Sequence, residues 1–349
     1  MNKQLSSWFL GRRIGLGFVL SVLVCGAGAE SAQVYVDRIA ADKRDIPAYI
    51  GLTEFQIQEL DQKVALKTQK RGLRYAKANG QKLALRTLGI RLWGMTGDVK
   101  KALREYKRGL RVKGSAQFPA LHLEMARVYF GQRAFSEAEE MLRLSLSADA
   151  MNNDAAESLL MRLQMVERAI AVTQSDFAFA QSINRAAVAH LLSQELSVAQ
   201  YLDLPKAVSV GETSDQGLTD YQGSEFAADI LATHRLNLRS FRITNGAFQP
   251  EKAMMRGELA LLVEDILYVK FGISRTAFIG SASPFSDLAS NDTSFNAIMS
   301  AVTRGLMQGR EDGSIGPQEL VSGAEAILVL HSLKQILKRP AQPKKEILS

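Results

Sequence analysis

Three predicted helix starts carry residues whose types and spacing suit the binding of an anion. Their sequences are Asn184-Arg185-Ala186-Ala187, Met255-Arg256-Gly257-Glu258 and Ser322-Gly323-Ala324-Glu325. The first N–H groups of a helix lack partners and carry partial positive charge, so a cation beside them completes a site for a carboxylate or a phosphate. Arg185 and Arg256 supply that cation, and Gly323 stands at the third start. The sequence therefore predicts at most two anion sites; the alternative is that both arginines pair with neighbouring carboxylates.

Four other residues at these starts are expected to cap the helices. Asn184 and Ser322 are of the types that accept a hydrogen bond from an amide in the first helical turn. Glu258 and Glu325 stand where a carboxylate bonds back to the start of its own helix. We therefore expect neither glutamate to be a catalytic acid.

The sequence shows no catalytic or metal motif. Asp312-Gly313 resembles part of a calcium loop, but the alternating oxygen ligands and the distal Glu are missing. There is no Gly-x-Ser-x-Gly, no P-loop and no dinucleotide fingerprint. The four histidines lie far apart and are expected at surface or boundary positions: His122, His190, His234 and His331. We therefore expect a protein that is not an enzyme, with no metal and no cofactor.

A strong positive charge marks residues 63–113, which hold sixteen Lys and Arg against Asp98 and Glu105. The local balance is +14, whereas the whole chain carries +7. On helices, such cations either form an ordinary solvated face or line one surface for an acidic partner. The expected basic face comprises Lys70, Arg71, Arg74, Lys100, Lys101, Arg104, Lys107 and Arg108.

The elements that must position the helix starts repeat along the C-terminal half. Residues 245–250, Asn-Gly-Ala-Phe-Gln-Pro, match residues 312–317, Asp-Gly-Ser-Ile-Gly-Pro, at an offset of 67 residues. A weaker match at an offset of 71 relates residues 175–189 to residues 246–260. Internal repetition at this period indicates supersecondary units that bury their apolar faces against one another.

The last copy resembles the S-layer homology (SLH) domain. It contains, in order, Phe285-Ser286-Asp287-Leu288, an apolar helix, Gly305-Leu306, the turn at Asp312-Gly313 and Pro317. The resemblance implies three repeats in a pseudo-threefold bundle that binds an anionic cell-wall polymer or peptidoglycan. It also implies that Arg185 and Arg256 take the place of the arginine in the family's Thr-Arg-Ala-Glu segment. No copy of that segment is complete here.

The N-terminal half is predicted to consist of helical hairpins. Thr53 and Gln56 match the capping box of a helix that Asn79-Gly80 would end. Ser136 and Glu139 match a second capping box. The later elements are expected as hairpins at residues 88–112 and 121–146 and a helix at 155–172.

These hairpins resemble tetratricopeptide (TPR) repeats. Small and aromatic residues recur with the family's spacing, namely Trp93, Ala102 and Tyr106, then Met125, Ala126, Tyr129, Ala138 and Leu142. Small alanines let paired helices approach closely. The resemblance implies a scaffold that binds a partner protein, not an activity. The helix at 155–172 could finish this stack or begin the SLH-like part, and we expect both.

The first 29 residues are predicted to be a secretory signal that is cleaved after Ala29. Cations and an apolar run at residues 14–24 precede Ala27-Gly28-Ala29. An uncleaved anchor and lipidation of Cys25, the only cysteine, are the alternatives. Nucleic acid is the usual partner of a basic patch. Export argues against it and favours an acidic protein or an anionic envelope component on the basic face.

The sequence thus predicts a mostly helical, all-α protein in which a TPR-like hairpin array precedes a three-repeat SLH-like bundle. The expected segments are a signal peptide (1–29), an N-terminal segment (30–52), TPR-like repeats (53–172), the SLH-like domain (173–338, with repeats near 173–200, 218–270 and 284–337) and a disordered basic tail (339–349). The expected function is that of an exported envelope protein that is anchored to the wall polymer and binds a partner protein. The alternative is an assembly factor whose degenerate SLH-like part binds protein or is purely structural.

Overall fold

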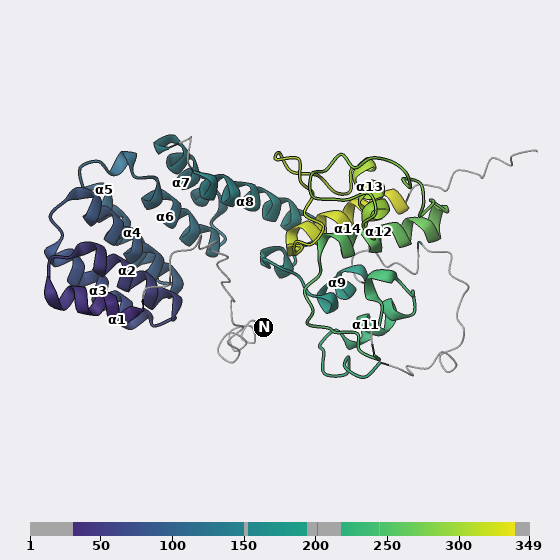
Figure 1. Ribbon diagram of the computed structural model, residues 1–349, viewed down its shortest axis with the longest axis horizontal. Coiled ribbons are helices and arrows are strands. Elements are labelled where there is room, and N and C mark those ends of the chain that lie inside the picture. Colours follow the sequence, from purple (N-terminus) through teal and green to yellow (C-terminus); the bar gives the residue numbers. More distant parts are fainter. Residues whose placement is uncertain (1–30, 150–152, 194–200, 202–217, 244, 339–349) are drawn as a thin grey trace, which may run out of the picture. The chain divides into compact units, whose positions relative to one another are not determined.

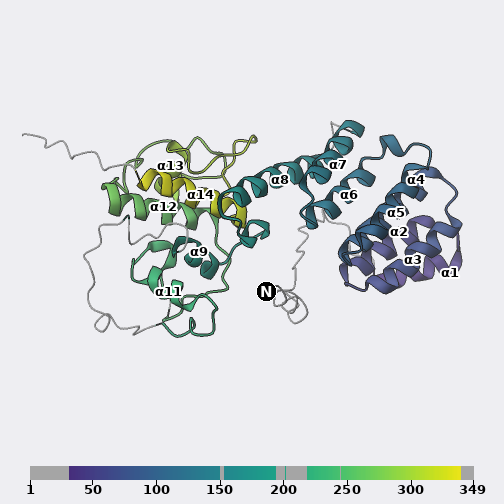
Figure 2. The same ribbon diagram turned by 180° about the vertical axis from the view of Figure 1, so that it is seen from behind.

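The computed structural model describes residues 31–149, 153–193, 201, 218–243 and 245–338. Every regular element among them is a helix, which confirms the predicted all-α fold (Figures 1 and 2). The α-helices are α1 (Ala32–Ala41), α2 (Ile46–Gln58), α3 (Gln62–Tyr75), α4 (Asn79–Met95), α5 (Val99–Leu110), α6 (Pro119–Gly131), α7 (Phe135–Ala148), α8 (Asp154–Thr173), α9 (Arg185–Leu191), α11 (Ala227–His234), α12 (Arg256–Phe271), α13 (Phe295–Thr303) and α14 (Gly323–Leu337). Short 3-10 turns lie at η1 (Ser115–Gln117), η2 (Asp176–Phe179) and η4 (Arg239–Phe241).

Two predicted segments lie outside the described residues. They are the signal peptide and the tail at 339–349. Among the helices that are described, none is both long and apolar enough to cross a bilayer.

The contacts divide the chain into an N-terminal unit, Met1–Val128, and a C-terminal unit, Tyr129–Ser349. This division lies before the boundary at 172 and 173 that we expect from the sequence. The reason is α8, which packs against both α7 and α14. The other segment boundaries stay a prediction.

In the N-terminal unit α2 packs on α3, α3 on α4, and α4 on α5. Its innermost side chains include Ile46, Tyr49 and Leu85, each at most 1% exposed. Asp61 and Asp98 precede α3 and α5, and each carboxylate accepts a hydrogen bond from the amide three residues later. These caps begin both basic helices at fixed positions.

Three local expectations are wrong. Thr53 lies inside α2, where its Oγ1 donates to a backbone oxygen four residues earlier. The cap of α2 is Asp45. Asn79 begins α4 and does not end a helix. The α7 helix starts without a side-chain cap, so the capping box predicted from Ser136 and Glu139 does not form.

In the C-terminal unit the helices pair in a closed circle. α9 packs with α11, α12 with α13, and α14 with α8. The second helix of each copy therefore contacts the first helix of the next copy. In the last copy, the second helix, α14, contacts α8, the first helix of the first copy. One chain thus supplies both members of each of these helix pairs.

A ring of backbone hydrogen bonds holds the three helix starts together. Ile183, Met254 and Val321 each lie two residues before α9, α12 and α14. Met254 N donates to Ile183 O, Val321 N to Met254 O, and Ile183 N to Val321 O, each at 2.9 Å. All three residues are at most 2% exposed, so the ring satisfies amides that no water could reach.

Buried charges tie the outer loops of this unit to α12. Glu264 and Asp265 are each 1% exposed. Arg239 Nε donates to Asp265 Oδ1 at 2.7 Å, and Arg275 Nη2 lies 2.9 Å from the same oxygen. Arg239 and Asn296 also donate to Glu264. Each buried carboxylate thus has hydrogen-bond partners, as its burial requires.

Candidate anion-binding site

The amides at the three helix starts are already bonded within the protein. Arg185 N donates to Lys252 O at 2.9 Å, and Arg256 N to Glu319 O at 2.8 Å. Gly323 N donates to Ala180 O at 3.0 Å. These carbonyls belong to the loop of the neighbouring copy. The free helix-start N–H groups that we expect from the sequence are therefore not available to an anion.

The caps at these starts come from three side chains. Asn184 Oδ1 accepts from Ala187 N at 2.8 Å, and Ser322 Oγ from Glu325 N at 3.2 Å. Glu258 Oε2 accepts from Met255 N at 2.9 Å. Glu325 has another partner, because its carboxylate accepts a hydrogen bond from Arg256.

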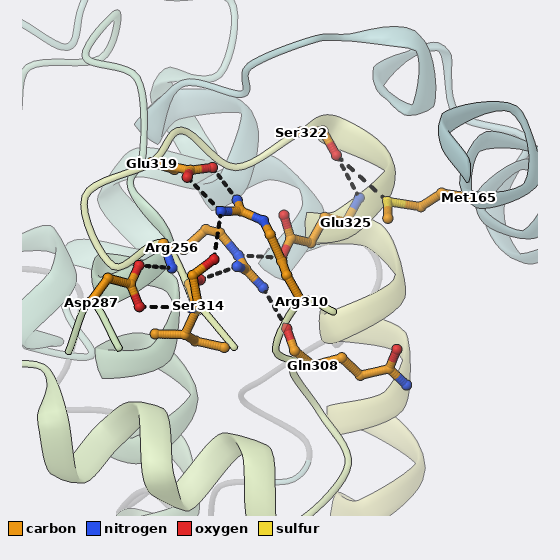
Figure 3. Close-up of polar contacts among 11 residues, drawn as sticks. Met165, Arg256, Asp287, Gln308, Arg310, Ser314, Glu319, Ser322 and Glu325 are labelled. Atoms are coloured by element: carbon orange, nitrogen blue, oxygen red, sulfur yellow. Dashed lines mark hydrogen bonds and ion pairs between the residues drawn. The ribbon is translucent and has the colours of Figure 1, made fainter. Parts of the chain in front are cut away.

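Arg256 is buried, 7% exposed, and fully engaged (Figure 3). Its Nε donates to Glu325 Oε1 at 2.8 Å, and Nη2 donates to Gln308 O at 2.9 Å. Nη1 donates to Ile315 O. The guanidinium therefore joins α12 to α14 and to the last loop, and its charge is neutralised by Glu325.

Arg185 is as deeply buried, 4% exposed, but differs in charge balance. Its Nη1 donates to Ser240 O at 2.9 Å and Nη2 to Arg242 O at 3.2 Å. The guanidinium carbon lies 4.9 Å from the ring centroid of Phe248. Within the described ranges no carboxylate pairs with it, and its Nε has no hydrogen-bond partner.

Burial lowers the pKa of Arg185, and the negative charges of Glu258 and Asp220 partly oppose that effect. Neither carboxylate contacts Arg185. Glu258 bonds Lys252 and Met255 N, and Asp220 accepts from two backbone amides of residues 248 and 249. A buried cation without a contacting carboxylate is costly, and Arg185 lacks the neutralising partner that Glu325 provides for Arg256.

The third helix start carries glycine at residue 323 because there is no space for a side chain. A Cβ atom at this residue would lie 1.8 Å from the backbone oxygen of Phe177, closer than any non-bonded approach. Any side chain here would collide with the loop of the first copy. The third start is thus closed by backbone.

Two aspartates brace the loops, a role that sequence reasoning missed. Asp287 accepts from Ile315 N at 2.8 Å and Gly316 N at 2.7 Å. Asp220, 67 residues earlier, accepts in the same way from Phe248 N and Gln249 N, each at 2.8 Å. The Ser286-Asp287 and Thr219-Asp220 pairs would have revealed it, because the loop offset is also 67.

The pKa of Asp287 reflects this bracing. Burial acts to raise it, but the hydrogen bonds from Ile315 and Gly316 N–H prevail and hold it below its ordinary value. Close by, Arg310 pairs with Glu319 and donates to Ser314 (Figure 3). This loop therefore has its own balanced charges.

The basic face lies on α3 and α5, within the N-terminal unit. Lys101 is half-buried and pairs with Asp98 at 2.6 Å, and Arg108 pairs with Glu105 at 2.8 Å. The other six are exposed and form no ion pair among the described residues: Lys70, Arg71, Arg74, Lys100, Arg104 and Lys107.

Of the four histidines, His122 departs from expectation. It is 5% exposed, and its Nδ1 lies 2.8 Å from Tyr106 Oη. Burial lowers the pKa of His122. His190 Nδ1 lies 2.7 Å from Asp229. Within the described ranges, no three His, Cys, Asp or Glu gather into a group that could hold a metal ion.

Comparison with known proteins bears on the last copy. Cell surface glycoprotein 1 of Acetivibrio thermocellus is 34% identical over 114 residues, which are 32% of this chain and 5% of that protein. The chain thus spans only a small part of the length of this relative. No solved structure matches this chain. The family-model comparison does not confirm the TPR resemblance of the hairpins, which stays a prediction. The family model of the S-layer homology domain matches residues 284–327, which confirms that the chain carries an SLH domain there.

Proposed function

We propose that this is an exported, non-enzymatic cell-envelope protein whose C-terminal unit binds an anionic cell-wall polymer or peptidoglycan. The SLH domain at 284–327 and the cell surface glycoprotein similarity support an envelope role. The predicted signal peptide supports export. The N-terminal unit serves as a scaffold for a partner, in keeping with its hairpins.

One observation carries the assignment of the binding residue. Arg185 is a buried cation that no described carboxylate contacts, whereas Arg256 is neutralised by Glu325. An acidic polymer that reaches the loop around Arg185 would supply the missing counter-charge. Arg242 is exposed, and its backbone oxygen accepts from Arg185, so its side chain adds positive charge beside the same place. Arg256 instead joins α12 to α14 through Glu325, and none of its hydrogen-bond partners contacts Arg185.

The test compares two matched variants of residues 30–349 in co-sedimentation with wall sacculi. Arg185→Gln removes the unneutralised charge, and Arg256→Gln removes a buried guanidinium that has a partner. We expect Arg185→Gln to reduce pelleting about tenfold, and Arg256→Gln to change it less than about twofold, below the melting temperature of both. Retained pelleting by Arg185→Gln would overturn this role.

Arg242→Glu keeps the test decisive if Arg185→Gln fails to fold. It changes only an exposed side chain, so we expect weaker pelleting with an unchanged melting temperature. Its control is Lys338→Glu, an exposed residue at the far end of α14. Equal pelleting by these two variants would contradict the site.

A second candidate function rests on the satisfied helix starts. Because their amides bond to neighbouring loops and Gly323 is closed by Phe177, the unit is complete without a ligand. This favours an assembly factor in which the SLH-like part is structural or binds protein. In that case neither sacculi nor soluble wall polymer would bind the C-terminal unit.

A further inference from the structure

Two helices of the N-terminal unit carry the same cationic pentapeptide. Residues 70–74 and 107–111 are both Lys-Arg-Gly-Leu-Arg, 37 residues apart. Earlier cations match at the same offset. The α3 row is Lys63, Lys67, Lys70 and Arg74, and the α5 row is Lys100, Arg104, Lys107 and Arg111. This spacing of four, three and four residues places each row along one face of its helix, over about 16 Å.

The inner faces of the two helices fix which way these rows point. Gly72 and Gly109 are buried, and a Cβ at Gly109 would lie 2.7 Å from Leu121 Cδ1. Ala65 and Ala102 are fully buried at the same offset. All eight row cations are exposed. The two helices thus bury matching small residues and present matching cations to solvent.

Both helices that carry the rows pack against α4. Lys70 Nζ of α3 and Lys101 Nζ of α5 lie 5.8 Å and 4.4 Å from the ring centroid of Trp93 on α4. A Cβ at Gly89 would lie 2.8 Å from Gln69 Nε2 and 3.4 Å from Glu105 Cγ. α3 and α5 thus flank α4 and contact the same part of it.

Nothing described on this surface neutralises the rows. None of the eight cations forms an ion pair with a described residue. The two acids of residues 63–113 are used elsewhere: Asp98 pairs with Lys101, and Glu105 with Arg86 and Arg108.

The hairpin does not need these cations in order to fold. In α7, Ala138 is fully buried and stands 36 residues after Ala102. The positions that correspond to the α5 row are Ser136, Glu140, Arg143 and Ser147, with one cation among four. A helix with the same buried alanine thus forms without the row.

We propose that the paired rows bind a linear phosphate-bearing polyanion. Two equally spaced lines of point charges, on helices that share a neighbour, suit a chain of repeated phosphates, each of which an ammonium can contact. A protein partner is disfavoured, because protein interfaces are depleted of Lys at their core. The large exposed aliphatic residues within these two helices, Val64 and Leu110, lie at the start of α3 and the end of α5, and Leu60 lies before α3, so no apolar face for a membrane runs along either helix.

The test uses residues 30–349 and long-chain inorganic polyphosphate, followed by the fluorescence of Trp93. Trp93 is the one tryptophan after the predicted signal peptide. The row variant is Lys67→Glu/Arg104→Glu. Its control is Lys43→Glu/Arg44→Glu, which reverses two exposed cations before α2 and changes the net charge equally.

We expect the row variant to bind polyphosphate at least about tenfold more weakly, and the control to lose less than about threefold, with affinity that falls steeply with salt. Poly-glutamate and phosphatidylglycerol vesicles should bind more weakly than polyphosphate. An equal loss of polyphosphate affinity in both variants would show that the rows are not the binding surface. Equal or tighter binding of poly-glutamate or of vesicles would contradict the assignment of a phosphate-bearing polyanion as the ligand. The rows lie outside the C-terminal unit, so failure here leaves the Arg185 proposal standing.

Discussion

Glu325 of α14 is the counter-charge of Arg256 on α12: Arg256 Nε donates to Glu325 Oε1 at 2.8 Å, with side chains 9% and 19% exposed. The pair joins the second copy to the third across the ring of backbone hydrogen bonds. In so little solvent, removal of one partner leaves an uncompensated charge.

Arg256→Met and Glu325→Gln should therefore couple. We expect the double variant to be more stable than the sum of the single costs by about 1–3 kcal/mol. Urea unfolding followed by circular dichroism measures this, with Trp93 fluorescence reporting the N-terminal unit separately. Strictly additive costs would show that the pair contributes nothing beyond its separate hydrogen bonds.

Gly323→Ala should destabilise the C-terminal unit by about 3 kcal/mol or more, because its Cβ would overlap the backbone oxygen of Phe177 and a main chain must move. The matched control is Gly223→Ala, since a Cβ there meets nothing within 4 Å. We expect the control to stay within about 0.5 kcal/mol of the unchanged protein. Similar melting temperatures for the two variants would show that the backbone of Phe177 does not exclude a side chain at residue 323.

Asp287→Asn should cost about 1 kcal/mol at neutral pH, because an amide NH2 group, which can only donate, replaces one of the two accepting oxygens. The folded-state pKa of Asp287 is lowered, so its contribution is present above the unfolded value of about 3.9 and is lost as pH falls through the lower folded value. The variant should thus lose less stability in acid than the unchanged protein.

The control for this variant is Glu311→Gln, which removes an exposed carboxylate from the same loop. Unfolding curves at pH 7 and pH 3 supply the measurement. An acid response that Asp287→Asn leaves unchanged would mean that other groups set it.

His122 should make the N-terminal unit sensitive to mild acid. Burial lowers its folded-state pKa, so the unfolded chain takes up a proton first as pH falls below about 6.5. Stability is therefore full above that pH and falls by at most about 1.4 kcal/mol per pH unit below it. His122→Gln should flatten this dependence, as measured by Trp93 fluorescence during urea unfolding at pH 8 and pH 5. An equal slope in the variant would contradict this.

The helices could be predicted because their apolar residues recur at helical spacing. Several of the helix boundaries could not be predicted. The Thr53 and Gln56 pattern occurs by chance inside α2, where Asp45 caps the helix two residues before Pro47. The equivalence of the three helix starts was visible in the offsets of 67 and 71 residues. The ring that joins them was not, because backbone bonds between Ile183, Met254 and Val321 have no side-chain signature.

The candidate site was predictable in position and not in environment. Arg185 and Arg256 stand at the first positions of their helices, as expected. Their burial depends on loops 50 to 60 residues further along, which the local sequence does not specify. Gly323 looked like a lost arginine, whereas the approach of Phe177 leaves room for nothing larger.

The circle of helices has a consequence for how the C-terminal unit is made. Its first member, α8, pairs with its last, α14, so the circle stays open until α14 has been synthesised. Until then Ile183 N has no Val321 carbonyl to bond, and one side of α8 stays exposed. Contacts between such distant segments form slowly. Any chain that stops before residue 323 would therefore lack a finished fold, so the folding of this unit requires that synthesis has passed through α14.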